Sequence, residues 1–177
     1  MKYKILIADD NVSNIDLVRF ILESGKEKYV FYSATDGLIA CNIAQQQIPD
    51  LILLDWHMPK MTGIQAIKAI KANPETRNIP VLLITGDPTE ENIAKAFEAG
   101  ARDYLTKPFN ELELISRVKA ALKDSFYKKK LIDPLTEINI LQSQISLLLN
   151  KSNKEIVEKF DSLTKKIKEI TTLIKKY

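Results

Sequence analysis

The sequence has very little cysteine and no long hydrophobic run. Its single cysteine, Cys41, cannot form a disulfide within the chain, which favours the reducing cytoplasm. No apolar run approaches the ~20 residues that a membrane-spanning helix needs. The first residues show no signal-peptide cleavage pattern. With 45% hydrophobic and 28% charged residues, the composition is that of a globular protein. We therefore expect a cytoplasmic protein with no membrane partner.

The net charge of +3 is small for 177 residues, but it is distributed unevenly. Residues 125–177 hold eleven lysines and six acidic residues, and they contain no arginine. Residues 1–124 hold fifteen basic and seventeen acidic residues. A mildly basic helical segment is most often a solvated face. The length suffices for one full core and an appendage, and we place the domain boundary after residue 124.

Short apolar runs alternate with helical patterns over the first 124 residues. Runs without polar alternation are typical of strands buried on both faces. We predict strands at residues 5–8, 29–32, 51–54, 81–84 and 102–105. Segments with helical spacing or helix-capping signals lie between them. This order predicts an α/β fold, a doubly wound five-stranded parallel sheet with helices on both faces.

Capping residues mark several of the predicted helix ends. We expect Ser13 or Asn14 to cap the first helix, because their side chains can accept from free backbone N–H groups. Asp87 is expected to cap the fourth helix, with Pro88 in its first turn, and Gly100 to end it. Asn110 is expected to cap the fifth helix.

Polar residues stand at the ends of several predicted strands. Right-handed crossovers bring the carboxyl ends of parallel strands to one edge of the sheet. We therefore expect Asp9, Asp10, Asp55, Thr85 and Lys107 to converge there. Three ionised carboxylates need a counter-charge. A hard cation such as Mg²⁺ supplies one and prefers oxygen ligands.

Such a group of residues suits phosphoryl transfer. Asp55 can act as a nucleophile and form an aspartyl-phosphate, in a reaction that depends mainly on positioning and charge neutralisation. The amine of Lys107 and the hydroxyl of Thr85 are suited to the phosphoryl oxygens, and Gly86 leaves room for the group to approach.

The spacing of these residues resembles the receiver domain of two-component response regulators. The resemblance covers residues 1–124. It rests on Asp55-x-x-Met58-Pro59-x-Met61-x-Gly63, Asp9-Asp10, Thr85-Gly86 and Lys107-Pro108-Phe109. It implies a flavodoxin-like fold that accepts phosphate from a phosphohistidine on a sensor histidine kinase or a phosphotransfer protein. The chain would then be a switch with self-catalysed phosphorylation and dephosphorylation, not an enzyme.

The resemblance also implies a metal site. Asp55 would be the phosphoacceptor, and Mg²⁺ would be held by Asp9, Asp10, Asp55 and the backbone carbonyl of His57. The imidazole of His57 is expected beside the site, where it affects how readily water reaches the phosphoryl group.

Two further features of the family match this sequence. Thr85 and Tyr104 match the pair of residues that switches on phosphorylation, and Lys107-Pro108 matches a cis peptide bond. Thr85 and Lys107 are therefore expected to take part in the chemistry, and Thr85 and Tyr104 in the response to it.

Residues 125–177 are predicted to form a helical, coiled-coil output segment. An apolar seam with alternating steps of four and three contains Ile156, Phe160, Leu163, Ile167, Ile170, Ile174 and Tyr177. The phase slips near residues 150–153, so we expect two helices, either hairpinned or stacked end to end. Their seam must be buried against a partner helix, another subunit or a client. We expect a homodimer through these helices, or through the face of the fourth and fifth helices.

Other functions are weighed against this one. A DNA-binding transcriptional regulator could use the basic tail, but that tail lacks arginine and its seam is apolar, so nucleic acid is not the expected partner. A phosphatase with an aspartate nucleophile places it after the first strand, with a second Asp two residues later. Here Asp55 follows the third strand, and His57 occupies that later position.

A truncated regulator of the diguanylate cyclase type is a further alternative. Asp133-Pro134-Leu135-Thr136 resembles the opening of that cyclase domain. Only 41 residues follow Thr136, the glycine-rich catalytic motif is absent, and Glu137 stands where a glycine is usual. We interpret the four residues as the start of a helix or as a remnant of a cyclase domain.

Overall fold

The computed structural model describes residues 2–25 and 27–127 and, further along, residues 138, 140, 162, 164, 165, 167 and 169. Strands and helices alternate within residues 2–127. The strands are β1 (Tyr3–Ala8), β2 (Tyr29–Ala34), β3 (Leu51–Asp55), β4 (Val81–Thr85) and β5 (Asp103–Thr106). The helices are α1 (Val12–Glu23), α2 (Gly37–Gln47), α3 (Gly63–Ala72), α4 (Glu90–Ala99) and α5 (Glu111–Tyr127). The predicted alternation is confirmed.

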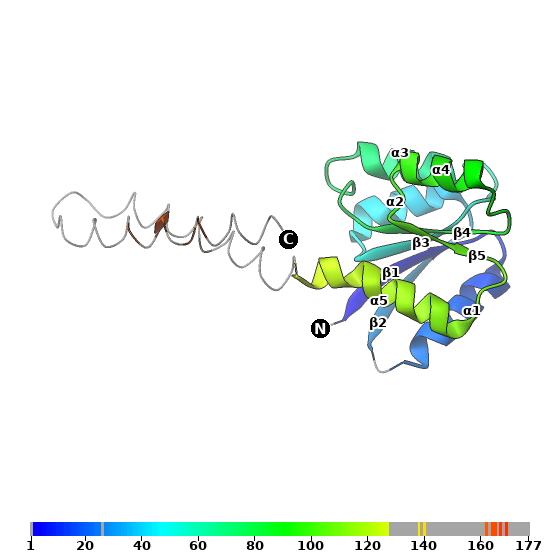
Figure 1. The fold of residues 1–177 in the computed structure, drawn as a ribbon, viewed down its shortest axis with the longest axis horizontal. Coiled ribbons are helices and arrows are strands. Elements are labelled where there is room, and N and C mark those ends of the chain that lie inside the picture. Colours follow the sequence, from blue (N-terminus) through cyan, green and yellow to red (C-terminus); the bar gives the residue numbers. More distant parts are fainter. Residues whose placement is uncertain are drawn as a thin grey trace. The chain divides into compact units, whose positions relative to one another are not determined.

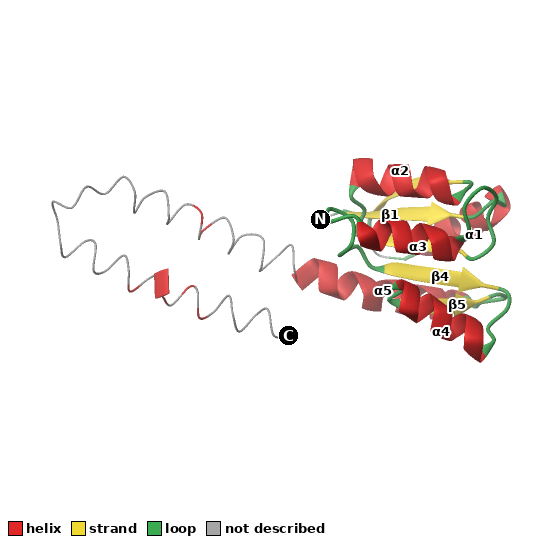
Figure 2. Ribbon diagram, turned by 90° about the horizontal axis from the view of Figure 1, so that it is seen from above, coloured by secondary structure: helices red, strands yellow, loops and turns green. Residues whose placement is uncertain are grey.

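The strands form one parallel sheet in the order β2-β1-β3-β4-β5. Helices α1 and α5 cover one face of the sheet, and α2, α3 and α4 cover the other (Figures 1 and 2). This is the flavodoxin-like, doubly wound arrangement, in which ligands bind outside the carboxyl ends of the strands.

The centre of the sheet is apolar on both faces. Every residue of β3 is buried. Its Ile52 and Leu54 belong to the cluster that includes residues of α2, α3 and α4, whereas Leu51 and Leu53 belong to the cluster with α1 and α5. Burial of each such side chain contributes about 1.5–3 kcal/mol. The unbroken apolar run in the sequence therefore follows from helices on both faces.

The strand register brings the carboxyl ends of four strands to one edge. Ala8 pairs with Leu54, so that Asp9 and Asp55 follow side by side. Asp55 in turn pairs with Ile84, and Thr85 pairs with Thr106, the residue before Lys107. The edge is thus assembled from residues distant in sequence, as the crossover rule predicts.

Two of the predicted helix caps are wrong. Helix α1 is capped by Asn11, whose side chain accepts from the N–H of Ser13 at 3.0 Å. Helix α4 is capped by Thr89, which accepts from the N–H of Asn92. Asp87 instead donates its N–H to the Thr85 hydroxyl. Asn and Thr are both good N-cap residues, so the choice between neighbouring candidates depends on the path of the loop.

Two predicted helix ends are confirmed. Gly100 ends α4 with a φ of 103°, in the left-handed region that glycine adopts without a steric penalty. The side chain of Asn110 accepts from the N–H of Glu113 at 2.8 Å at the start of α5. Strand β5 begins one residue later than predicted, at Asp103.

The chain divides into two compact units, residues 1–122 and 123–177. The predicted C-terminal seam, apart from Ile167, lies outside the described residues. Its helical structure, its association and the domain boundary at residue 124 stay predictions. Within the described residues, none of the helices is long and apolar enough to cross a membrane.

Candidate functional site

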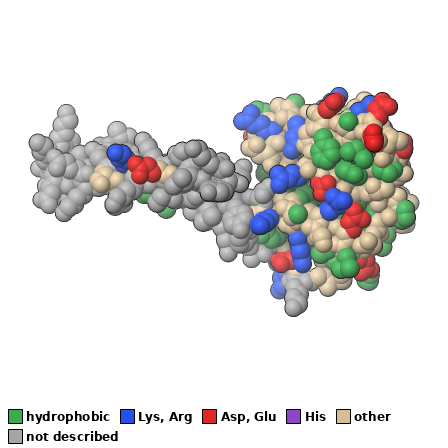
Figure 3. Space-filling model, viewed as in Figure 1, with side chains coloured by type: hydrophobic (Ala, Val, Ile, Leu, Met, Phe, Trp, Pro, Cys, Tyr) green, Lys and Arg blue, Asp and Glu red, His purple; other side chains and the backbone are tan. Residues whose placement is uncertain are grey.

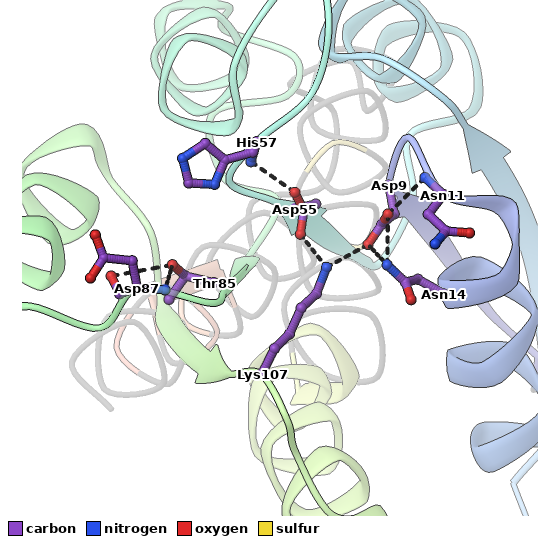
Figure 4. A network of polar contacts seen from close by, with 8 residues as sticks. All are labelled: Asp9, Asn11, Asn14, Asp55, His57, Thr85, Asp87 and Lys107. Carbon is purple, nitrogen blue, oxygen red and sulfur yellow. Dashed lines mark hydrogen bonds and ion pairs between the residues drawn. The ribbon is translucent and has the colours of Figure 1, made fainter.

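Asp55 occupies the centre of the candidate site, at the carboxyl end of β3. The residue is only 6% exposed. Its Oδ2 accepts from the backbone N–H of His57 at 2.7 Å, and its Oδ1 forms an ion pair with Nζ of Lys107. Figure 4 shows Asp55 between these two donors, with the imidazole of His57 turned away from the carboxylate. The carboxylate is thus oriented by one backbone group and one cation.

Lys107 joins Asp55 to Asp9. Its Nζ lies 2.8 Å from Asp9 Oδ2. Asp9 also accepts from the backbone N–H of Asn11 at 2.9 Å, and from the side-chain amide of Asn14 at 3.0 Å on both oxygens. The buried carboxylates of Asp9 and Asp55 therefore share the amine of Lys107. The peptide bond between Lys107 and Pro108 is cis, as predicted.

Sequence reasoning missed the roles of Asn11 and Asn14. Asn14 was expected as a possible helix cap, yet its amide holds Asp9. The available signal was its position five residues after Asp9, in the first turn of the helix that follows β1. A polar amide there can turn back toward the strand end.

Burial and charge shift the pKa values of this pair. Burial raises the pKa of Asp55 above its ordinary value, against the opposing effect of its hydrogen bond with Lys107. Burial would lower the pKa of Lys107, but its hydrogen bonds with Asp55 and Asp9 outweigh this and raise it. Lys107 therefore stays protonated at neutral pH. One lysine does not fully offset two buried carboxylates, so the site favours a further cation.

The chemistry of Asp9 and Asp55 fits Mg²⁺, which typically takes one or two protein carboxylates and keeps several waters. Both carboxylates reach the same amine. Asp10, predicted as a third ligand, is exposed. In the part of the chain that the structure describes, no group of three or more His, Cys, Asp or Glu is placed to hold a metal ion. Of the predicted ligands, Asp9 and Asp55 therefore meet at one amine, and ligation by Asp10 and by the His57 carbonyl stays a prediction.

Thr85 lies at the same edge but points its hydroxyl to a different partner. It is 2% exposed, and its Oγ1 accepts from the N–H of Asp87 at 3.1 Å. The next residue, Gly86, faces open space, since a Cβ there would meet nothing within 4 Å. The space next to the Gly86 Cα is therefore open, and the approach of a phosphoryl group at this glycine stays a prediction.

Tyr104 is half-buried on β5, opposite Leu83 rather than Thr85. Its ring packs edge-on against Phe97, with centroids 6.1 Å apart, and the guanidinium of Arg117 lies 5.7 Å from its centre. The two predicted switch residues thus occupy neighbouring strands, with Thr85 at the carboxyl edge and Tyr104 against Phe97 of α4 and Arg117 of α5.

A cavity of about 370 Å³ adjoins the site. Asp9 and Lys107 line it on the side of the carboxylates. Its other walls come from α1, β4 and the start of the β5–α5 connection: Asn14, Leu17, Val18, Ile84, Pro108 and Phe109. A mainly apolar cavity beside a few convergent charges is typical of a binding site.

The fold and the site together define a class of protein: a doubly wound α/β domain with buried carboxylates and a lysine at the carboxyl edge of its sheet. Residues 5–119 match the family model of the response regulator receiver domain. The chain therefore belongs to the response regulator receiver-domain family of two-component systems.

Curated relatives support this assignment. The chain is 36% identical over 157 residues to the phosphate regulon transcriptional regulatory protein PhoB of Shigella flexneri, a match that covers 89% of this chain and 64% of PhoB. It is 38% identical over 120 residues to the response regulator PleD of Caulobacter vibrioides, covering 68% of this chain and 26% of PleD. The chain thus spans less than two thirds of the length of these relatives.

A solved structure gives the same result. The receiver domain of a sensor histidine kinase from Pseudomonas aeruginosa superposes with a TM-score of 0.64 at 28% identity, over 70% of this chain and 99% of that one. That structure holds a magnesium ion coordinated in its active site cleft.

Proposed function

We propose that this protein is a response regulator that accepts a phosphoryl group on Asp55 from a phosphohistidine, and that phosphorylation controls helix-mediated protein association. The observation that carries the proposal is the arrangement around Asp55. Its carboxylate is held by the His57 N–H and by Lys107, next to the open position at Gly86. A nucleophile, a cation and an uncrowded glycine thus occur together at one edge.

The residues have distinct parts in this chemistry. An oxygen of Asp55 forms a bond to phosphorus as the phosphorus–nitrogen bond of the donor breaks, and the nitrogen leaves with its electron pair. Lys107 neutralises charge on the phosphoryl oxygens, and the hydroxyl of Thr85 donates to one of them after rotating away from Asp87. Asp9 and Asp55 would hold Mg²⁺, with Asp10 and the His57 carbonyl as expected further ligands. When bound, the ion supplies positive charge to the transferred group.

The proposed donor is a sensor histidine kinase or a phosphotransfer protein. Support comes from α1, where Leu17 and Phe20 are 50% and 69% exposed. Leu17 also lines the cavity beside Lys107. Exposed apolar side chains next to a charged site mark a surface suited to a protein partner.

Association of two copies is the proposed output. One candidate surface is the face of α4, β5 and α5, where Phe97 is 46% exposed and Arg117 pairs with Asp103 and Glu113. Figure 3 shows a group of hydrophobic side chains in the region where Figure 1 places α4. The other candidate is the apolar seam predicted within residues 125–177. In this proposal the chain is a switch, and not an enzyme with an external substrate.

Light scattering with and without beryllofluoride and Mg²⁺ tests this function. Beryllofluoride mimics a phosphoryl group on a carboxylate, so we expect the mean mass to rise when both are present. A mass that stays the same would contradict the proposed output.

Transcriptional regulation is the second candidate, because the similarity to PhoB extends over 157 residues and PhoB is named as a transcriptional regulatory protein. The lack of arginine in residues 125–177 argues against it. Binding to DNA that weakens steeply with salt would favour this candidate.

A further inference from the structure

The connection between β3 and α3, residues 56–62, contains a strained turn centred on Lys60. The N–H of Met61 donates to the carbonyl of Pro59 at 2.6 Å, which closes a three-residue turn. The φ of Lys60 is +63°. A γ-turn with a positive φ at its centre is rare, and the left-handed region is unfavourable for a residue with a Cβ. Such a conformation persists where the surrounding structure holds it in place.

The side chain of Lys60, which is 63% exposed, pairs with a buried carboxylate. The Nζ of Lys60 lies 2.6 Å from Oδ2 of Asp36, whose side chain is 2% exposed. The Oδ1 of Asp36 accepts from the N–H of Ile39 at 2.8 Å as the N-cap of α2. The carboxylate is therefore fixed at both oxygens, and Lys60 is attached to a rigid point. We call the ion pair between Asp36 and Lys60 the α2 latch.

Close packing next to the α2 latch leaves the turn little freedom. Gly37 lies against Met61 so closely that a Cβ at Gly37 would collide with the Met61 carbonyl. The sulfur of Met61 also contacts the sulfur of Cys41 at 3.8 Å. The turn is thus contacted by two residues of α2, Gly37 and Cys41, and by the N-cap residue Asp36, which lie 20 to 24 positions earlier in the sequence.

The same connection is tied at its other side to Asp55. The N–H of Gly63 donates to the Trp56 carbonyl at 2.9 Å, and a Cβ at Gly63 would collide with the carbonyl of Asp55. The N–H of His57 donates to Asp55 Oδ2 at 2.7 Å. A short segment that is fixed at both ends has little conformational freedom. A displacement of the turn at Lys60 would therefore move the backbone N–H of His57.

We propose that Asp36 and Lys60 are positioning residues for phosphoryl acceptance. Their ion pair holds the strained turn, and the turn keeps the N–H of His57 against the carboxylate of Asp55. This inference rests on the proposed function, since it takes Asp55 as the acceptor. Neither residue needs to touch the phosphoryl group; each acts through the backbone of residues 57–61.

The first experiment measures amide hydrogen exchange of residues 56–62 in the unmodified protein, without any phosphodonor. Asp36→Asn keeps an oxygen for the N-cap but loses the charge, and Lys60→Met keeps the apolar stem. We expect exchange to become about tenfold faster in both. Lys60→Arg, which preserves the charge, should exchange as the wild type does. Lys95→Met is the matched control, because it removes an exposed 2.6 Å ion pair with Glu91.

The second experiment measures the rate of phosphorylation at a series of acetyl phosphate concentrations with Mg²⁺. We expect Asp36→Asn and Lys60→Met to lower the maximal rate by about three- to tenfold, because the nucleophile is less well oriented. The half-saturating concentration should not change. The double variant should be no slower than the slower single variant, since both remove the same pair. Lys60→Arg and Lys95→Met should retain the wild-type rate.

The outcomes separate the two proposals. Unchanged exchange in the variants, or faster exchange with an unchanged maximal rate, would overturn the positioning role. A wild-type protein that is not phosphorylated on Asp55 would overturn the proposed function and the positioning role with it. In that case the exchange measurement alone still shows whether the α2 latch holds the loop.

Discussion

Lys107 and Asp9 are 98 residues apart in the sequence, yet Nζ of Lys107 donates to Oδ2 of Asp9 at 2.8 Å. The same amine forms an ion pair with Asp55. The contact exists because a parallel sheet brings the carboxyl ends of β1 and β3 and the residue after β5 to one edge. It leaves two buried carboxylates and one cation together at that edge.

The first prediction concerns the acceptor. Asp55→Asn should abolish formation of an acid-labile phosphate from acetyl phosphate and Mg²⁺, because an amide is not a nucleophile. The free energy of unfolding should stay within about 1 kcal/mol of wild type, since Lys107 keeps Asp9 as its partner and a neutral group replaces a buried charge. Labelling at the normal rate would show that the acceptor lies elsewhere.

The second prediction concerns Lys107 and the metal. Lys107→Ala should lower the free energy of unfolding by roughly 2–4 kcal/mol with EDTA present, because two buried carboxylates lose their counter-charge. The lower part of this range applies since the lysine side chain is 29% exposed. Mg²⁺ should restore part of the loss, measured by urea unfolding with and without the ion. Equal stability of the variant in Mg²⁺ and EDTA would argue against a metal at Asp9 and Asp55.

The third prediction concerns pH. The hydrogen bond from Lys60 and the N–H of Ile39 lower the pKa of Asp36 below its ordinary value of 3.8. A lowered carboxyl pKa adds stability that is present above 3.8 and is lost as the pH falls through the folded-state pKa. The difference in unfolding free energy between wild type and Asp36→Asn should therefore be constant from about pH 5 to 8 and shrink below 3.8. A difference that persists unchanged at lower pH would show that the charge of Asp36 is not its source.

The fourth prediction concerns coupling between the site and the outer face. Thr85→Ala should leave phosphorylation of Asp55 largely intact but reduce any phosphate-dependent change in association. The reason is that the Thr85 hydroxyl is the proposed donor to the phosphoryl group, and that Tyr104 is proposed to change its position in response. Loss of its hydrogen bond with Asp87 should cost only about 1 kcal/mol. Light scattering with beryllofluoride checks this, and a response equal to wild type would contradict the route through Thr85 and Tyr104.

The fifth prediction concerns the C-terminal seam. Replacing Leu163 and Ile167 by Asp would introduce charge into an apolar seam, which costs several kcal/mol if the seam is buried. We expect the self-associated form to disappear, with the receiver domain still folded and phosphorylatable. Sedimentation velocity measures the association. The same oligomer before and after the change would place the interface elsewhere, with the face of α4 and α5 as the next candidate.

The order of strands and helices, and the residues that stand at the carboxyl edge of the sheet, follow from the amino-acid sequence alone. The apolar runs at residues 51–54 and 81–84 predict buried strands, because they are too short for buried helices and strands covered on both faces are apolar throughout. Once the strands are known to be parallel, chain topology alone brings Asp9, Asp55, Thr85 and Lys107 to one edge. The resemblance to receiver domains added their proposed roles and the cis bond at Lys107-Pro108.

Which of several chemically similar neighbours makes each contact depends on how the chain packs in three dimensions. Asp9 turns inward to Lys107, whereas the adjacent Asp10 is exposed. Asn11 caps α1, and Asn14 holds Asp9 instead. Neighbouring residues of the same type have the same local propensities, so the sequence offers no basis for choosing between them. The sequence does not predict the α2 latch for a related reason. Asp36 and Lys60 meet at 2.6 Å only because α2 packs against the β3–α3 connection.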